Sequence, residues 1–78
     1  MPPKFANIKP RQVDCALERA GFYIHTTTGS HVQLKYPQKP GRITVPYHTR
    51  SDLPKHIIRS IIRQARVTNK QFFDLLKR

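Results

Sequence analysis

Apolar residues near the start of the chain follow the period of an amphipathic helix. Pro10 fits the first turn of a helix, where its missing N–H is not needed. The residues after it place apolar side chains at the spacing i, i+3, i+4, i+7: Val13, Ala16, Leu17 and Ala20. Gly21 can end the helix in the left-handed conformation. We therefore expect a helix from Pro10 to Gly21, preceded by a loose segment over residues 1–8.

From residue 22 the apolar period changes to two, which is typical of a strand. A first strand is expected over residues 22–27, with Phe22 and Ile24 facing the core. A second strand is expected over residues 31–36. Its core-facing side chains are Val32, Leu34 and Tyr36, and its outer face carries His31, Gln33 and Lys35.

The pairing of these two strands depends on the length of the loop between them. A three-residue loop over residues 28–30 would set Thr27 opposite His31 and His25 opposite Gln33. A two-residue loop would place the inward set of one strand opposite the outward set of the other. The pattern therefore favours the three-residue loop, with Gly29 or a neighbour at positive φ.

Three further elements follow. A third strand is expected over residues 42–45, with Ile43 and Val45 inward and Pro46 ending it. A second helix opens at Pro54, and its apolar stripe is Ile57, Ile58, Ile61, Ile62 and Ala65. Thr68 and Gln71 have the spacing of a capping box and open a short C-terminal helix. The predicted class is α+β, in the order α-β-β-β-α plus that helix, with a three-stranded antiparallel sheet.

Composition limits the function classes. The chain has 78 residues, enough for one domain over residues 1–78, and carries a formal net charge of +11. Residues 29–66 hold eight Lys and Arg against one Asp, so a polyanionic partner such as RNA is expected. No apolar run could span a bilayer, no signal-peptide pattern is present, and the lone Cys15 suits a reducing compartment. We therefore expect a cytoplasmic protein that does not bind membranes.

Most enzyme chemistry can be excluded on the same grounds. The four acidic residues offer no pair suited to a glycosidase or a two-metal nuclease, and Asp14 with Glu18 reads as a solvated helix face. The histidines lack metal-ligand spacing, and no phosphate-binding or dinucleotide-binding loop exists. We expect no metal and no cofactor.

RNA cleavage remains, because it needs few protein groups. The ribose 2′-OH is an internal nucleophile, so a proton-transfer group and nearby cations suffice. His31 meets the first need, and Lys35 and Arg42 meet the second. His25 and His48 are secondary candidates. A purely structural histidine at position 31 is the alternative reading of the same pattern.

Four ordered motifs resemble the HicA-type toxins: Gly21-Phe22, Gly29-Ser30-His31, Thr44-Val45-Pro46-x-His48, and residues 59–65, Arg-Ser-Ile-Ile-Arg-Gln-Ala. The resemblance covers residues 9–73. It implies a fold like that of double-stranded-RNA-binding domains, an mRNA interferase activity and a HicB-type antitoxin. It also implies that His31 is catalytic. His56 and Arg66 stand where the family often has glycine, so the second helix is expected to end differently or run on.

The predicted function is that of a toxin which cleaves mRNA without a metal ion. It would be a monomer alone and a hetero-oligomer with its antitoxin. The residues expected to hold RNA are Ser30, Gln33, Lys35 and Arg42, together with the helical ridge of Arg59, Arg63 and Arg66. That ridge could equally face an acidic antitoxin. The alternatives are a non-catalytic module that binds double-stranded RNA and a basic partner-binding domain.

Overall fold

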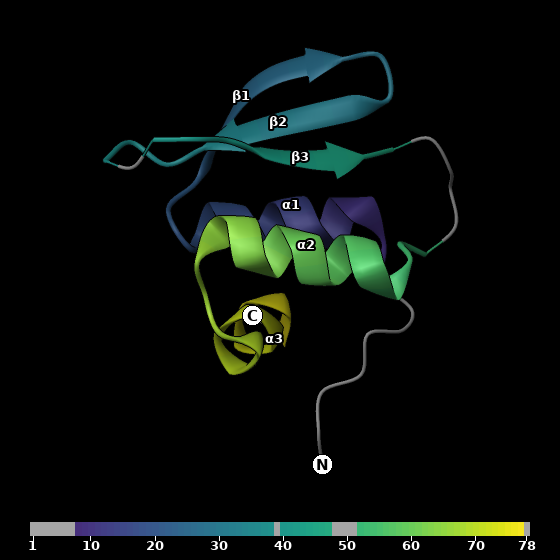
Figure 1. Cartoon of the computed structure of the whole chain (residues 1–78), viewed down its shortest axis with the longest axis vertical. Helices are drawn as coiled ribbons and strands as arrows, with labels where there is room; N and C mark the ends of the chain where they lie inside the picture. Colours follow the sequence, from purple (N-terminus) through teal and green to yellow (C-terminus); the bar gives the residue numbers. More distant parts are fainter. Residues whose placement is uncertain (1–7, 39, 48–51, 78) are drawn as a thin grey trace.

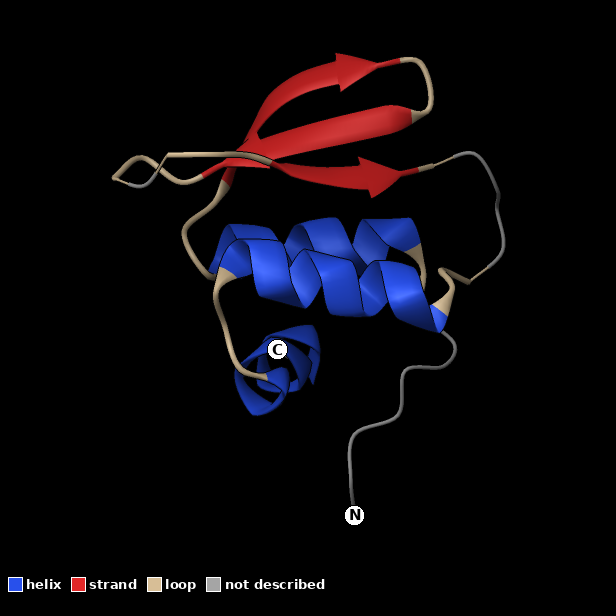
Figure 2. Cartoon of the chain, in the orientation of Figure 1, coloured by secondary structure: helices blue, strands red, loops and turns tan. Residues whose placement is uncertain are grey.

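A computed structural model describes residues 8–38, 40–47 and 52–77 of the chain (Figure 1). Its elements are α1 (Pro10–Arg19), β1 (Tyr23–Thr28), β2 (His31–Lys35), β3 (Ile43–Pro46), α2 (Lys55–Ala65) and α3 (Asn69–Lys77). The strands form one antiparallel sheet in the order β1-β2-β3. Figure 2 shows α1 and α2 lying between this sheet and α3. The predicted α+β class, with its C-terminal helix, is confirmed.

The core lies between the sheet and the helices. The apolar sets predicted from periodicity in α1, β2, β3 and α2 meet there, because each element presents its apolar residues on one face. The fully or almost fully buried members of these sets are Val13, Ala16, Leu17, Val32, Leu34, Ile43, Val45, Ile58, Ile61, Ile62 and Ala65. Phe72 of α3 is also fully buried, and α3 packs against α1. Helix α3 therefore belongs to the same core.

The β1–β2 hairpin differs from the expectation. Thr28 pairs with His31, so the loop is Gly29 and Ser30 alone, with Gly29 at a φ of 55°. The predicted three-residue loop is wrong. The register shifts between Ile24 and Thr26, which leaves His25 as the extra residue of a β-bulge. A bulge absorbs one residue and so restores the pairing of inward faces that strict alternation could not give.

Ile24 was expected in the core, but 47% of it is exposed. It lies opposite the buried Leu34 on β2, yet β1 is the outer strand of the sheet and stands farthest from the helices (Figure 1). The helices contact mainly β3, so little covers the inner face of β1 at this point. Phe22, just before β1, is half-buried and packs on the core.

Gly21 ends the α1 region at a φ of 104°, as its position after the apolar stripe predicts. A Cβ at this position would lie 2.9 Å from the ring of Tyr36. Tyr36 follows β2 rather than continuing it, and its ring meets that of Phe22 edge-on with 5.1 Å between centroids. Glycine at 21 is thus required both by the backbone and by this close approach.

The ends of the last two helices show one confirmation and one error. Thr68 and Gln71 form the predicted capping box, with N···O distances of 2.9 and 3.1 Å. Pro54 is the N-cap of α2, so the helix begins one residue later than expected. Arg66 was expected to prevent a left-handed end to α2, yet it adopts that conformation itself, at φ 59° and ψ 39°.

Replacing Arg66 with glycine should raise the free energy of unfolding by about 0.5–1 kcal/mol. The left-handed conformation costs a residue with a Cβ about 1–2 kcal/mol, whereas glycine adopts it freely and loses part of that gain through its more flexible unfolded chain. Urea unfolding measures the change. Arg63→Gly, inside α2, is the matched control and should lose about 1 kcal/mol. An Arg66→Gly variant less stable than the parent would contradict the inference that Arg66 is strained.

Candidate nucleic-acid interface around His31

His31 is the first residue of β2 and is half-buried. Its backbone lies opposite Pro46, the last residue of β3, in the antiparallel ladder. One residue further on, the Tyr47 N–H donates a hydrogen bond to the Ser30 carbonyl oxygen. A backbone hydrogen bond therefore joins the Gly29–Ser30 turn to the end of β3. His31 lies between these two contacts, so its backbone is held in place on both sides.

A groove of about 270 Å³ opens beside His31, between the sheet and α2. The sheet contributes His31, Thr44 and Pro46 to its walls, and α2 contributes Ile57, Ser60, Ile61 and Gln64. The Gln64 Nε2 donates to the Ser60 Oγ at 2.9 Å, so the two polar side chains from α2 form one unit. The groove thus joins an imidazole, hydroxyls and an amide over an apolar floor.

Three groove residues received no role from the sequence: Thr44, Ser60 and Gln64. A signal for them existed, since Ser60 and Gln64 lie one helical turn apart at i, i+4 and so share a helix face. Thr44 shares the outer face of β3 with Pro46 by strand alternation. What the sequence did not reveal is that α2 packs against β3, which brings Ser60 and Gln64 beside Thr44.

Two of the expected RNA-binding residues share a sheet face with His31. Gln33 and Lys35 follow His31 on β2 with the alternation expected, and both are half-buried. Gln33 lies opposite Thr44 on β3. Arg42 is exposed and precedes β3 at the other end of that strand. The outer face of β2 and β3 is therefore polar and basic along its length.

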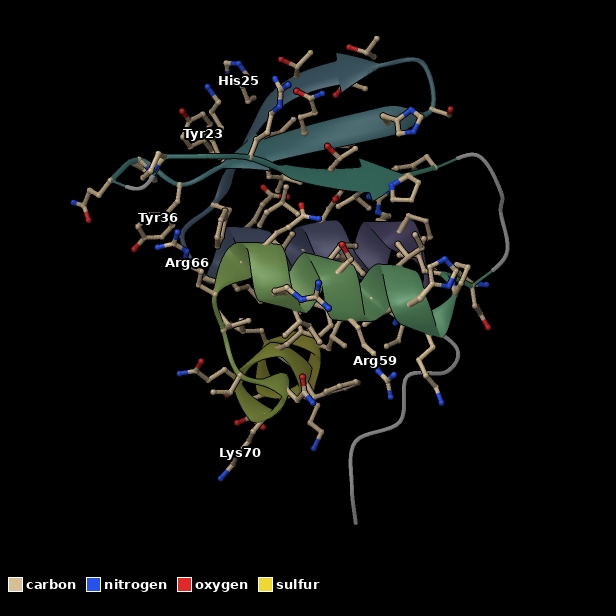
Figure 3. All side chains as sticks on the ribbon, in the orientation of Figure 1. Tyr23, His25, Tyr36, Arg59, Arg66 and Lys70 are labelled. Atoms are coloured by element: carbon tan, nitrogen blue, oxygen red, sulfur yellow. The ribbon has the colours of Figure 1, made fainter. Side chains whose placement is uncertain are left out.

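The ridge of Arg59, Arg63 and Arg66 is exposed along α2, as the helical pattern predicts. None of the three lines the groove at His31. Figure 3 shows Arg59 pointing away from the sheet, and Arg66 beside Tyr36 at the opposite end of the helix. Arg66 instead lines a second, smaller cavity together with Arg42. The ridge is therefore not one patch facing His31.

Of the secondary histidines, His25 lies exposed at the bulge of β1, away from the helices (Figure 3). It does not line the groove at His31. Ser30 is half-buried in the hairpin turn, directly before His31. His48 falls outside the residues that the structure describes.

Asp14 and Tyr47 form a buried polar contact that the sequence did not indicate. The Tyr47 hydroxyl donates to Asp14 Oδ2, and only 6% of Asp14 is exposed. The other carboxylate oxygen, Oδ1, has no hydrogen-bond partner among the described residues. The expectation of a solvated face is wrong for Asp14 and right for Glu18, which is exposed. The contact ties α1 to the segment that holds the Ser30–His31 turn.

Burial sets the ionisation of this pair. It raises the pKa of Asp14 above its usual 3.8, against the opposing effect of the Tyr47 hydrogen bond. Burial also raises the pKa of Tyr47, and the hydrogen bond to Asp14 adds to that rise. Tyr47 therefore remains a hydroxyl donor at neutral pH.

One comparison with known proteins decides the family. Residues 10–67, more than half of the chain, match the family model described as the HicA toxin of bacterial toxin-antitoxin. The chain belongs to the HicA toxin family. It is a toxin of a toxin–antitoxin system, and the resemblance seen in the sequence motifs is confirmed. No curated protein matches the chain.

The HicA match ends at residue 67, before α3. The matched part contains His31 and each of the described residues that line its groove. Helix α3 lies beyond it, and the Arg19 guanidinium donates from Nη1 to the Leu75 carbonyl oxygen at 2.7 Å. In this toxin α3 therefore supports α1 from the side away from the sheet.

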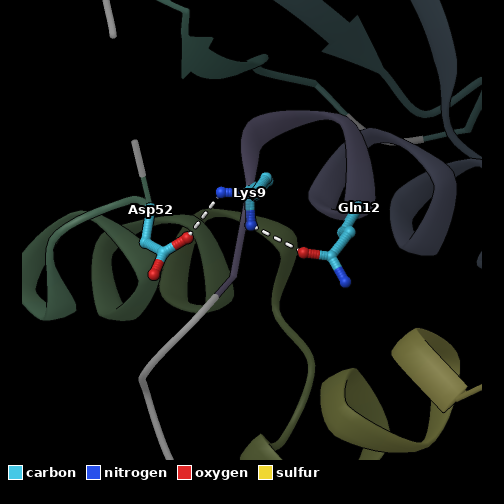
Figure 4. A network of polar contacts seen from close by, with 3 residues as sticks. All are labelled: Lys9, Gln12 and Asp52. Atoms are coloured by element: carbon cyan, nitrogen blue, oxygen red, sulfur yellow. Dashed lines mark hydrogen bonds and ion pairs between the residues drawn. The ribbon is translucent and has the colours of Figure 1, made fainter. Parts of the chain in front are cut away.

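Little acidic charge opposes the basic surface of the toxin. Asp14 is buried, and Asp52 pairs with Lys9 at 3.0 Å between Oδ1 and Nζ (Figure 4). Lys9 also donates its backbone N–H to Gln12 Oε1 at 2.8 Å, at the start of α1. The exposed pair adds about 0–1 kcal/mol to stability. Its larger effect is to occupy one of only four carboxylates in the chain.

The described part of the chain carries neither a metal-binding cluster of side chains nor a membrane-spanning helix. No three His, Cys, Asp or Glu side chains in this part of the chain gather closely enough to hold a metal ion. None of its helices is both long and apolar enough to cross a membrane.

Asp14→Asn should make the toxin more stable at neutral pH and flatten the pH dependence of its stability. A raised folded-state pKa means that the native state binds the Asp14 proton more tightly than the unfolded chain does. Ionised Asp14 therefore destabilises the fold at neutral pH. This penalty falls as the pH drops through the folded-state pKa, and it is absent below the unfolded value of 3.8.

Urea unfolding at several pH values measures the effect. The advantage of Asp14→Asn should be present at pH 7 and disappear near pH 3. Asp74→Asn, on the exposed side of α3, removes the same charge and controls for the overall positive charge of the chain. An Asp14→Asn variant less stable than the parent at pH 7 would show that the ionised carboxylate is needed.

Proposed function

We propose that this toxin is an endoribonuclease that cleaves mRNA without a metal ion, with His31 as its proton-transfer group. The observation that carries the proposal is the position of His31, half-buried at a groove of about 270 Å³ on a strongly basic chain. The groove supplies polar groups for a nucleotide beside the imidazole. Membership of the HicA toxin family supports the same reading.

The reaction needs no nucleophile from the protein. The ribose 2′-oxygen attacks the adjacent phosphorus and loses its proton, and the bond from phosphorus to the 5′-oxygen breaks. That oxygen takes up a proton, so the products are a 2′,3′-cyclic phosphate and a 5′-hydroxyl. His31 accepts the first proton or donates the second. Lys35, farther along the same face of β2, adds positive potential that favours the negative charge developing on the phosphate.

Cleavage of RNA in the presence of EDTA tests this proposal. The purified toxin should cut single-stranded RNA when every free divalent ion is chelated, and the 5′ fragments should carry 2′,3′-cyclic phosphate ends. A parallel reaction with DNA of the same sequence should give no products, because DNA has no 2′-OH. Cleavage that stops on adding EDTA would overturn the metal-independent mechanism.

A second candidate is a non-catalytic module that binds double-stranded RNA. The order α1-β1-β2-β3-α2 and the net charge of +11 favour it. The same preparation distinguishes the two. Salt-sensitive binding to an RNA duplex, with no cleavage of any RNA, would support the module and overturn the nuclease.

We further propose that the antitoxin is of the HicB type, and that the toxin is a monomer alone and a hetero-oligomer with it in the cytoplasm. An acidic antitoxin surface would complement the exposed arginines of α2. Light scattering of the toxin with and without the co-expressed antitoxin measures both states. A toxin that is already a dimer by itself would overturn the first of them.

A further inference from the structure

Gln64 lies between two cavities on the same side of the molecule. It lines the groove at His31, and it also lines a small cavity of about 20 Å³ at the other end of the β3–α2 seam. Arg42, Arg66 and Tyr36 are among the residues that surround this second cavity. Gln64 therefore lies between the groove at His31 and a cavity bordered by two arginines from separate elements.

Among the residues that the structure describes, no acid pairs with either of these two arginines. Both are exposed, and no described residue offers either guanidinium a hydrogen bond or an ion pair. Of the four acids in the chain, Asp14 is held by Tyr47 and Asp52 by Lys9. Two unpaired guanidinium groups at one cavity favour an anion, and arginine binds phosphate oxygens with paired N–H donors.

The backbone of Arg66 is strained. Its φ of 59° is the only positive value among the non-glycine residues that the structure describes. A residue with a Cβ is strained in this conformation, and such residues gather at functional sites. Glycine would end α2 here without strain. An arginine in place of glycine at this strained position therefore indicates that its guanidinium has a function beside Arg42.

The distance from the His31 end of the groove to the two arginines fits an extended strand of RNA. Along β3, Arg42 lies four residues from Pro46, the partner of His31, which is about 13 Å at the rise of a strand. Along α2, Ser60 and Arg66 are six residues apart, about 9 Å. The distance along β3 corresponds to roughly two internucleotide steps of an extended single strand, and the distance along α2 to between one and two.

We propose that Arg42 and Arg66 form a phosphate subsite for the RNA strand that is cut at His31, about two nucleotides from the cleaved phosphate. Gln64 contacts the nucleotide that lies between the cleaved phosphate and the phosphate bound by the two arginines. This inference rests on the proposed nuclease function and assigns its substrate as single-stranded RNA that extends beyond the cleaved dinucleotide.

The test uses DNA oligonucleotides with a single ribonucleotide at a cleavage site mapped on longer RNA. Only that linkage can be cut. The shortest substrate is the dinucleotide, and two others add two nucleotides on the 5′ or the 3′ side. One extension should raise kcat/KM by about tenfold, and a neutral methylphosphonate at the distal linkage should remove that gain.

The variants are Arg42→Ala and Arg66→Gly. For each variant, the ratio of kcat/KM for the extended substrate to kcat/KM for the dinucleotide should fall from about ten to about one. Arg66→Gly relieves backbone strain, so its loss could not come from unfolding. Lys70→Ala, on α3 and far from the seam in Figure 3, removes the same charge and should cut both substrates normally. Variants that keep the full gain would overturn the subsite.

Binding separates failure of the subsite from failure of the nuclease. If the parent cuts no RNA, the affinity of the same oligonucleotides, labelled with a fluorophore, still tests the subsite. A methylphosphonate that weakens binding to the parent by about tenfold, but not to Arg42→Ala, supports it. Equal affinity of both oligonucleotides for the parent overturns it, whatever the outcome of the cleavage reaction.

Discussion

His31→Ala should lower the rate of RNA cleavage by about 10²–10⁴-fold, the usual contribution of a positioned proton-transfer group. His31 is the only histidine among the described residues that lines the groove between β3 and α2. Its pairing with Pro46 is made by the backbone, so alanine leaves the sheet intact. Single-turnover cleavage of one RNA substrate, with parent and variant at equal concentration, measures the loss.

His25→Ala is the matched control, because it removes an exposed imidazole from the neighbouring strand. Its cleavage rate should stay within about twofold of the parent, since a surface substitution away from the groove leaves the site unchanged. Circular dichroism should give the same spectrum for all three proteins. A His31→Ala variant that cuts RNA at the parental rate would exclude His31 as the catalytic group.

Phe72→Ala should lower the free energy of unfolding by about 3–5 kcal/mol, the range for deleting a fully buried aromatic ring. Phe72 is 0% exposed, and its ring meets that of Phe73 edge-on with 5.7 Å between centroids. Domains of this size have about 5–15 kcal/mol of stability in total, so the loss removes a large fraction of it. The midpoint of urea unfolding measures the change.

Lys77→Ala, on the exposed side of α3, is the control and should change stability by less than about 0.5 kcal/mol. A Phe72→Ala variant with a similarly small loss would show that α3 contributes little to the core. The HicA match ends before this helix, so the result also measures how much a helix outside the family match contributes to the stability of the fold.

The position of His31 on the outer face of the sheet could be predicted although the hairpin loop could not. Its side is decided by Val32 and Leu34, which must face the core whatever the loop does. The loop length was wrong because a bulge at His25 shifted the register of β1, and alternation contains no sign of a bulge. The groove beside His31 needed α2 in place, and no local pattern supplies that.

Arg66 shows the same division at the end of α2. The spacing i, i+4, i+7 predicts that Arg66 lies on the exposed face of the helix. Its left-handed conformation does not, because residues with a Cβ rarely adopt it and the sequence argued against it. Its position beside Arg42 depends on the packing of α2 against β3.

The sequence by itself determined the features that depend on neighbours in the chain. These are the apolar stripes of α1 and α2, the inward faces of β2 and β3, the capping box at Thr68, and the basic charge. The tertiary structure alone decided the burial of Asp14 against Tyr47, the exposure of Ile24, and the position of Arg66 beside Arg42. The reason is physical: periodicity indicates which side of an element is apolar, whereas burial depends on which other element covers that side.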